Sequence, residues 1–183
     1  MKLAFIGAHK TGKTELAERI YTYFAEIPHP TCFVKNIAGE IEKTEGINLL
    51  KQSTRQLQER ILEKQIIQEI QFAASLDYWD IISDGAPLSH YAYFREIERK
   101  RENKDKNSEK YWGSLDNIVK AWMYSYNKIF KLDPRQGADD GIIKIDMEIN
   151  NLLKRFDIRH VRLYDKDRPN WENIVKKELG YFL

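Results

Sequence analysis

The sequence predicts an α/β protein in which helices cover both faces of an open parallel sheet. One basis for this prediction is that short apolar segments, typical of buried strands, alternate with longer segments of helical period. A second basis is size, because 183 residues are enough for one domain. Hydrophobic residues make up 42% of the chain and charged residues 32%, so a sizeable core can form beneath a charged surface.

Five strands are expected in this sheet. The first covers Lys2–Ile6, an apolar run that ends at Gly7, as a strand buried on both faces should. The other four are expected over residues 31–34, 78–83, 128–132 and 160–164. Because a helical segment separates each strand from the next, the strands should pair in parallel.

Helices are expected between the strands. Leu16, Ala17, Ile20 and Phe24 recur at helical spacing in the segment 15–24, and Pro28 should follow the end of that helix. The strongest helical period lies in the segment 54–76. Further helices are expected over residues 87–101, 115–126, 145–156 and 171–179. We expect a single domain, 1–183, with a short helix near residue 36 and flexible acceptor or lid segments at about 36–53, 100–114 and 133–144.

Charge and cysteine content narrow the class of protein. Thirty Lys and Arg residues against 28 Asp and Glu give a net charge of +2, which argues against a globally basic nucleic-acid binder but leaves a local basic groove open. The single cysteine, Cys32, excludes an internal disulfide and fits a reducing compartment. Apolar runs are far shorter than the ~20 residues that span a bilayer, and the N-terminal one is too short for a signal peptide. We therefore expect a cytoplasmic protein that does not enter a membrane.

The segment Gly7–Thr14 matches the phosphate-binding pattern G-x-x-x-x-G-K-[ST] at every defined position. It follows a predicted strand and opens a predicted helix, so its backbone N–H groups and the helix N-terminus can surround a phosphate. Lys13 can reach the β- and γ-phosphates of ATP, and the Thr14 hydroxyl can bind Mg²⁺. The predicted ATP-binding residues are Gly7, Ala8, His9, Lys10, Thr11, Gly12, Lys13 and Thr14.

Asp84 is the predicted second acid of the site. It comes directly after an apolar strand segment, and ligands of open α/β sheets bind at the carboxyl ends of the strands. Asp84 could hold Mg²⁺ or accept the proton of an attacking hydroxyl. The alternative is an N-cap for the helix that begins near Pro87. Asp80, within the strand pattern, is the weaker candidate.

Arg135 is the predicted catalytic cation of a lid. Phosphoryl transfer needs positive charge over the moving phosphoryl group, and Arg135 lies in a polar loop between the fourth strand and the next helix. Lys131 and Lys144 lie on either side of it in the sequence. An ordinary exposed arginine is an equal alternative at this position.

The acceptor pocket is expected between the second strand, the helix after it and the helix after the third strand. Glu40, Arg55, Tyr91 and Arg95 are the predicted substrate-binding residues, and Asn36 and Gln58 are further candidates. Glu40, Arg55 and Gln58 could equally be plain helix-surface residues. An aromatic group could stack on a base, although core packing would explain most of its members. The group comprises Tyr91, Tyr93, Phe94, Tyr111, Trp112 and Trp122.

The chain resembles small P-loop kinases of the nucleoside and nucleotide type, especially the AAA-domain branch with ribosylnicotinamide kinase and thymidylate kinase-like proteins. The loop 7–14, the helix with Gln58 and Gln65, and the segment 84–93 carry the resemblance. It implies a three-layer α/β/α sandwich and transfer of the γ-phosphoryl group of ATP to a small acceptor. The sequence departs from the family where Gly85 replaces an arginine, where 139–143 lacks a lid arginine, and where 36–40 lacks Glu-x-x-Arg.

Three functions are compatible with these residues. The first is an ATP- and Mg²⁺-dependent kinase of a nucleoside, a nucleotide or a related small acceptor. The second is a kinase of a modified base within DNA, similar to the 5-hydroxymethyluracil DNA kinases of bacterial viruses, with the charged run 95–110 on the phosphates. The third is an NTP-binding switch or ATPase without a small acceptor. A homodimer is left open.

Overall fold

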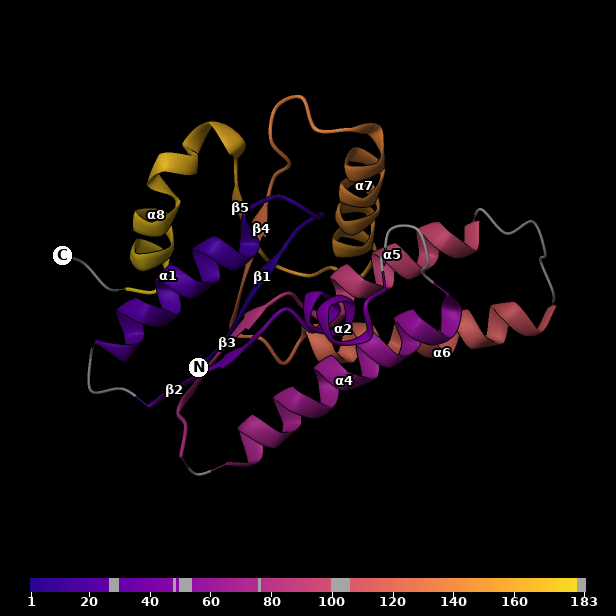
Figure 1. Cartoon of the computed structure of the whole chain (residues 1–183), viewed down its shortest axis with the longest axis horizontal. Coiled ribbons are helices and arrows are strands. Elements are labelled where there is room, and N and C mark those ends of the chain that lie inside the picture. The colour runs from indigo at the N-terminus through magenta and orange to yellow at the C-terminus, as the bar shows by residue number, and fades with distance from the viewer. Residues whose placement is uncertain (27–29, 48, 50–53, 76, 100–105, 181–183) are drawn as a thin grey trace.

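The computed structural model describes residues 1–26, 30–47, 49, 54–75, 77–99 and 106–180 of the chain. Strands and helices alternate along it, and Figure 1 shows helices on both sides of a central sheet. The strands are β1 (Lys2–Ile6), β2 (Thr31–Val34), β3 (Asp80–Asp84), β4 (Lys128–Leu132) and β5 (Val161–Leu163). The helices are α1 (Lys13–Ala25), α2 (Ile37–Glu45), α4 (Arg55–Ala74), α5 (Pro87–Arg99), α6 (Lys106–Met123), α7 (Asp140–Arg155), the 3₁₀ helix η1 (Asp165–Asn170) and α8 (Trp171–Glu178).

The five described strands form one parallel sheet in the order β2-β3-β1-β4-β5. The predicted α/β fold class with a five-stranded parallel sheet is therefore confirmed. Strand β1 lies in the centre, between β3 and β4, and Phe5 is in register with Asp84. The carboxyl ends of β1 and β3 consequently lie side by side at one edge of the sheet, which is where ligands bind in folds of this kind.

Alternation along β1 divides the core between two helical layers. Leu3 and Phe5 pack in a cluster with apolar residues of α1 and α8. Ala4 and Ile6 point to the opposite face and pack in a cluster with residues of α4, α5, α6 and α7. Because successive side chains of a strand face opposite ways, a run that is apolar throughout needs a cover on both sides.

Several boundaries differ from those expected, and three of the differences have a clear structural basis. Strand β3 begins at Asp80 instead of residue 78, because Tyr78 and Trp79 are exposed and lie before the sheet. Helix α7 begins at Asp140 instead of residue 145, because the Asp139 side chain accepts a hydrogen bond of 2.9 Å from the Ile142 amide and caps it. Helix α6 begins at Lys106 instead of residue 115, and the partly buried Tyr111 and Trp112 pack against the core from it.

The three segments expected to be flexible are partly helical. Helix α2 covers 37–45, α6 covers 106–114 and α7 covers 140–144. Residues 48, 50–53 and 100–105 lie outside the described part of the chain, as does Pro28. Their flexibility stays a prediction.

A buried carboxylate connects α4 to the sheet and to α6. Glu69 is fully buried and accepts hydrogen bonds from Tyr126, Trp122 and Ser83 at 2.7 to 3.2 Å. Its Oε2 also lies 2.8 Å from the Lys2 ammonium, which sits over the Trp122 and Tyr126 rings. Such a network stabilises a fold only while its members are all satisfied.

Replacing Glu69 with Gln is expected to lower the free energy of unfolding by about 3 kcal/mol, because Lys2 loses its counter-charge and one donor loses its acceptor. Urea denaturation measures the change. Glu63→Gln, an exposed position on the same helix, is the control and should change stability by less than about 0.5 kcal/mol. Equal stability of the two variants would contradict a structural role for the network.

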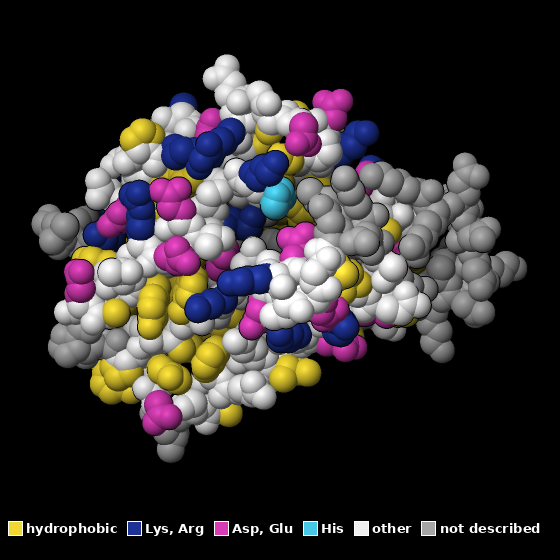
Figure 2. All heavy atoms as spheres, viewed as in Figure 1, with side chains coloured by type: hydrophobic (Ala, Val, Ile, Leu, Met, Phe, Trp, Pro, Cys, Tyr) yellow, Lys and Arg dark blue, Asp and Glu magenta, His cyan; other side chains and the backbone are white. Residues whose placement is uncertain are grey.

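The surface carries both signs of charge. Figure 2 shows Lys and Arg side chains interspersed with Asp and Glu over the face in view, together with a group of hydrophobic side chains. Among the described residues, none of the helices combines the length and the hydrophobicity of a membrane span.

Candidate active site

The loop between β1 and α1 holds the predicted phosphate-binding pattern. Gly7 has φ +154°, and a Cβ there would lie 2.7 Å from the Leu132 carbonyl oxygen. Gly12 has φ +93°, and a Cβ there would lie 2.7 Å from the Arg168 guanidinium. Both positions therefore require glycine. Thr11 is buried, and its hydroxyl donates a hydrogen bond of 2.9 Å to the Ala8 carbonyl oxygen. This hydrogen bond connects the two sides of the loop.

The side chain of Lys13 folds back over the loop toward Ala8. Its ammonium group donates to the Ala8 carbonyl oxygen at 2.7 Å. Burial lowers the pKa of Lys13 to about 8, although the Asp84 and Asp146 carboxylates oppose the shift. A polyphosphate in the loop would add negative charge beside this amine and favour its protonated form.

Asp84 is the last residue of β3 and is brought against the start of α1. Its Oδ2 accepts a hydrogen bond of 2.6 Å from the Thr14 hydroxyl, while its buried Oδ1 has no hydrogen-bond partner among the described residues. Burial raises the pKa of Asp84, and the Thr14 hydrogen bond and the Lys13 charge counter that effect. The carboxylate is thus directed at the loop and not at the amides of α5, which argues against the N-cap alternative.

Asp80, the weaker candidate, lies at the opposite end of the same strand. Its Oδ1 is 2.5 Å from the N-terminal ammonium of Met1. Because the phosphate-binding loop is at the other edge of the sheet, Asp80 contacts a different part of the molecule.

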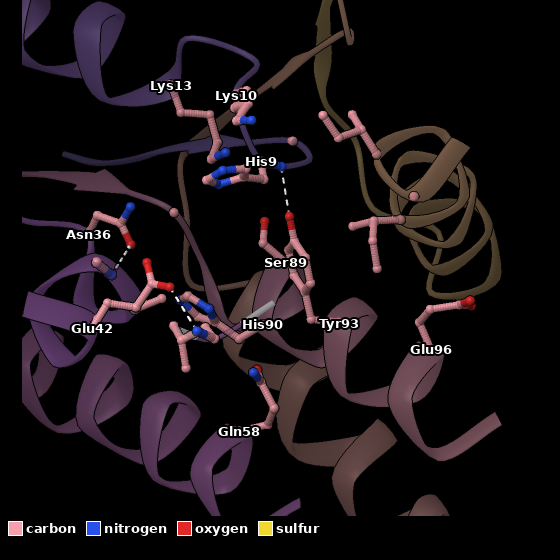
Figure 3. A pocket seen from close by; sticks show the side chains of 18 of the residues that line it. His9, Lys10, Lys13, Asn36, Glu42, Gln58, Ser89, His90, Tyr93 and Glu96 are labelled. Atoms are coloured by element: carbon pink, nitrogen blue, oxygen red, sulfur yellow. Dashed lines mark hydrogen bonds between the residues drawn. The ribbon is translucent and has the colours of Figure 1, made fainter. Parts of the chain in front are cut away.

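A cavity of about 390 Å³ opens beside the loop. Its walls come from the loop, α2, α4, α5 and α7, and Figure 3 shows the labelled side chains that line it. Tyr93 connects two of these walls, because its hydroxyl oxygen accepts a hydrogen bond of 2.7 Å from the His9 amide. The lining residues include Gly7, His9, Lys10, Lys13, Asn36, Glu42, Gln58, Asp84, Gly85, Ser89, His90, Tyr93, Glu96, Asp139 and Lys144.

The structure places the predicted acceptor residues differently. Asn36 and Gln58 line the cavity. Glu40 does not, and its carboxylate is 3.0 Å from Lys64 on the surface. The side chain of Arg55 lies outside the described part of the chain.

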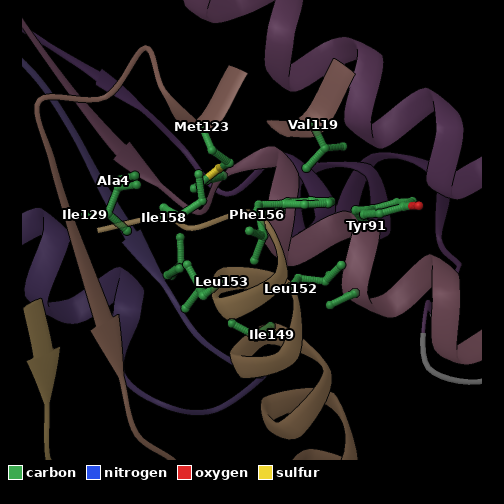
Figure 4. Close-up of a cluster of buried hydrophobic side chains, with 14 of the residues drawn as sticks. Ala4, Tyr91, Val119, Met123, Ile129, Ile149, Leu152, Leu153, Phe156 and Ile158 are labelled. Carbon is green, nitrogen blue, oxygen red and sulfur yellow. The ribbon is translucent and has the colours of Figure 1, made fainter. Parts of the chain in front are cut away.

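Tyr91 and Arg95 are turned away from the cavity. Tyr91 is fully buried in the core cluster of Figure 4, and its hydroxyl donates to Asp116 at 2.6 Å. Arg95, one turn further along α5, donates to Glu148 at 2.6 Å. The other aromatic candidates, Phe94, Tyr111, Trp112 and Trp122, likewise belong to the core or pack against it.

Arg135 lies in the exposed loop between β4 and α7, outside the cavity lining. The next residue, Gln136, donates its amide to Asp165 at 2.9 Å and so joins this loop to η1. The role of Arg135 as a lid cation stays a prediction.

Of the cavity residues of α5, the sequence had pointed only to Tyr93, as a member of the aromatic group. Ser89, Tyr93, Glu96 and Ile97 line it at spacings of three and four, continuing from Gly85. That spacing places them on one face of the helix. Following this face from Gly85 would have found them, whereas Tyr91 and Arg95, seven and eleven positions after Asp84, belong to another face.

Arg168 is a second residue that the sequence did not reveal. From η1, its guanidinium donates to the Thr11 carbonyl oxygen at 3.0 Å and to Asp165 at 3.0 Å, and it lies over the Trp171 ring at 4.3 Å. Asp165 and Trp171 fix the orientation of the Arg168 guanidinium, so its hydrogen bond to Thr11 supports the backbone of the loop.

If the loop binds ATP, as the sequence predicts, replacing Arg168 with Ala is expected to raise the KM for ATP about fivefold to tenfold with a smaller change in kcat, because the loop loses this support. Steady-state kinetics with varied ATP measure the effect, with the exposed Arg159→Ala as the control. An ATP KM equal to that of the control would show that the loop keeps its shape without Arg168.

The parallel sheet, with the loop Gly7–Thr14 between β1 and α1, is a fold that solved structures share, a deoxyadenosine kinase among them. The chain is similar over its full length to half of a NadR protein in complex with NAD and AMP-PNP, with a TM-score of 0.72 and 15% identity. It is also similar to deoxyadenosine kinase from M. mycoides with bound dCTP, where both chains are covered completely, with a TM-score of 0.65 and 14% identity. The same enzyme with bound dATP gives a TM-score of 0.64 at 14% identity, covering 98% of this chain and 100% of that one.

The chain is similar to these proteins in structure and not in sequence. No family model matches the sequence. No curated protein sequence matches it. The chain spans half the length of the NadR protein, so any shared activity concerns only a part of that protein.

Proposed function

We propose that the protein transfers the γ-phosphoryl group of ATP to a hydroxyl group of a nucleoside-type acceptor. The observation that carries the proposal is the joint position of Lys13, Thr14 and Asp84 beside a cavity of about 390 Å³. A loop built for phosphate and a cavity next to it are what a phosphoryl donor and an acceptor need. The fold shared with NadR and deoxyadenosine kinase supports the same class of reaction.

Thr14 and Asp84 fit a magnesium ion. They offer a hydroxyl and a carboxylate, the oxygen ligands that Mg²⁺ takes, and the buried Asp84 Oδ1 has no other partner among the described residues. When bound, the ion would neutralise charge on the β- and γ-phosphates. ATP and Mg²⁺ are therefore the proposed cofactors.

The chain's own residues position the reaction. The loop amides and Lys13 hold the phosphates of the donor, and Asp84 lies where the loop meets the cavity. In the transfer, the acceptor oxygen bonds to the γ-phosphorus as the bond to the β,γ-bridging oxygen breaks. Asp84 contributes either by holding the cation or by accepting the proton of the hydroxyl, and both roles need its charge.

The two alternative functions, a kinase of modified bases in DNA and an NTP-binding switch, differ from the proposed one in the acceptor they need. A kinase of modified bases in DNA would use the charged run 95–110, of which residues 100–105 and the side chains of 106–110 lie outside the described part. An NTP-binding switch would need no acceptor cavity beside the loop. The cavity favours a small acceptor.

The deciding experiment incubates the protein with γ-labelled ATP, Mg²⁺ and a panel of nucleosides, nucleoside monophosphates and DNA containing 5-hydroxymethyluracil. We expect label in a nucleoside. Label only in DNA would establish the first alternative, and label only in free phosphate would support the second.

A further inference from the structure

Three buried polar atoms at the cavity have no hydrogen-bond partner among the described residues: Asp84 Oδ1, Ser89 Oγ and His90 Nε2. All three residues line the cavity, and they are 1%, 4% and 8% exposed. A buried polar atom without a partner destabilises the folded state, so such atoms in native proteins usually have a hydrogen-bond partner. Asp84 has its proposed role already, which leaves Ser89 and His90 to be explained.

Ser89 and His90 lie where α5 meets the cavity. Tyr93, on the same helix, is engaged by the His9 amide at 2.7 Å. A Cβ at residue 85 would lie 3.7 Å from His90 Nε2, so the glycine keeps a side chain away from that edge of the imidazole. In Figure 3 both residues lie between the loop, with Lys10 and Lys13, and the remote end of the cavity at Gln58. A molecule that fills the cavity would therefore contact Ser89 and His90.

The charges of the cavity disfavour a second phosphate. The lining contains four carboxylates, Glu42, Asp84, Glu96 and Asp139, against three lysines, Lys10, Lys13 and Lys144. Arginine is absent from the described lining, and Arg95 of α5 is held by Glu148 instead. Arginine side chains commonly bind phosphate monoesters through two parallel hydrogen bonds, and a phosphate brought close to carboxylates is repelled by their like charge.

His90 does not supply the missing cation. Its burial, together with the charge of Lys13, lowers the pKa of His90 to about 4. The imidazole is therefore neutral near pH 7, where Nε2 can donate or accept one hydrogen bond according to its tautomer. A neutral imidazole and a hydroxyl suit an uncharged polar group.

We propose that Ser89 and His90 orient the phosphoryl acceptor, and that this acceptor is an unphosphorylated nucleoside whose hydroxyl or amide groups bond to Ser89 Oγ and His90 Nε2. The inference rests on the proposed function and adds to it the residues that select the acceptor and the charge of the molecule selected.

The first experiment compares acceptors with the wild-type protein. Adenosine, guanosine, cytidine, uridine and thymidine are tested against their 5′-monophosphates with γ-labelled ATP and Mg²⁺. We expect kcat/KM for the best nucleoside to exceed that for its monophosphate by about 100-fold. Equal or better use of the monophosphate overturns the inference while leaving the kinase function intact. Transfer to no acceptor at all overturns the proposed function and the inference with it.

The second experiment tests the two side chains with the best nucleoside. His90→Phe keeps an aromatic ring and removes both nitrogens, so the KM for the nucleoside should rise about tenfold while the KM for ATP stays the same. His90→Gln, which restores a polar nitrogen, should recover most of the loss. Ser89→Ala should raise the nucleoside KM about threefold to tenfold. The control is His160→Phe, an exposed residue preceding β5.

Two further measurements separate orientation of the acceptor from a merely structural role. Calorimetric binding of the nucleoside without ATP should weaken by the same factor in His90→Phe. Its urea midpoint should be no lower than that of the wild type, because the variant removes a buried unpartnered atom. An unchanged nucleoside KM in His90→Phe and Ser89→Ala, or an equal rise in both substrates' KM values, overturns the proposal.

Discussion

Replacing Lys13 with Met is expected to lower kcat/KM for phosphoryl transfer about a thousandfold or more, because the ammonium that neutralises the donor phosphates is lost. Methionine keeps most of the length of the side chain. The expected loss of stability is small, because the variant gives up a hydrogen bond of 2.7 Å to the Ala8 carbonyl oxygen, while burial disfavours the charge of the amine. Transfer assays and urea denaturation measure the two effects separately.

The control for this prediction is Lys120→Met, which changes an exposed lysine of α6. It should leave both activity and stability close to those of the wild type. Retained turnover in Lys13→Met would count against the whole site, since the loop would then hold no essential cation. A variant that is inactive and also unfolded would show that Lys13 supports the loop itself.

The phosphate-binding loop could be predicted from the sequence because its determinants are local. Gly7 and Gly12 are needed for backbone geometry within a few residues, and the apolar run before the loop has to be a buried strand. The order of strands and helices along the chain could be predicted because it, too, depends on local sequence patterns. Asp84 could also be predicted, because a residue at the carboxyl end of a parallel strand lies at the edge of the sheet where ligands bind.

The acceptor side could not be predicted in this way, because α5 is covered on several sides. It contacts α4, α6 and α7, and residues 87–92 are all buried, so its apolar pattern does not mark one inner face. Tyr91 and Ser89 are equally plausible from the sequence, yet one lies in the core and the other at the cavity. The choice depends on where α7 packs, which is a tertiary property.

Arg168 illustrates the limit more sharply. The residue lies 157 positions after Thr11, whose carbonyl oxygen it contacts. An arginine in a polar segment such as Asp165–Asn170 has no local feature that separates it from an exposed one. Only the parallel arrangement of β4 and β5, which brings η1 behind the loop, creates the contact.

Replacing Asp84 with Asn is expected to lower kcat about 100-fold or more, with smaller changes in both KM values. The amide has nearly the same shape, and its oxygen can still accept the 2.6 Å hydrogen bond from Thr14. What disappears is the negative charge, which both proposed roles of Asp84 require. Steady-state kinetics at saturating ATP and Mg²⁺ measure the loss.

The same variant should be as stable as the wild type near pH 7, or more stable. Burial raises the pKa of Asp84, so the folded state disfavours the ionised carboxylate that the unfolded state carries freely. The neutral amide removes that cost at neutral pH, and the difference should shrink as the pH falls toward the ordinary pKa of an aspartate. Urea denaturation at several pH values follows it, with the exposed Asp77→Asn as the control.

Activity and stability should thus move in opposite directions at residue 84, as happens where a charge is kept in place for chemistry although it destabilises the fold. If Asp84 served only to hold Thr14 and the start of α1, the asparagine variant would keep its kcat. A drop in kcat with stability retained or raised therefore separates a catalytic carboxylate from a structural one. This separation holds whether the charge binds the cation or accepts the proton, because the asparagine variant removes the charge in both cases.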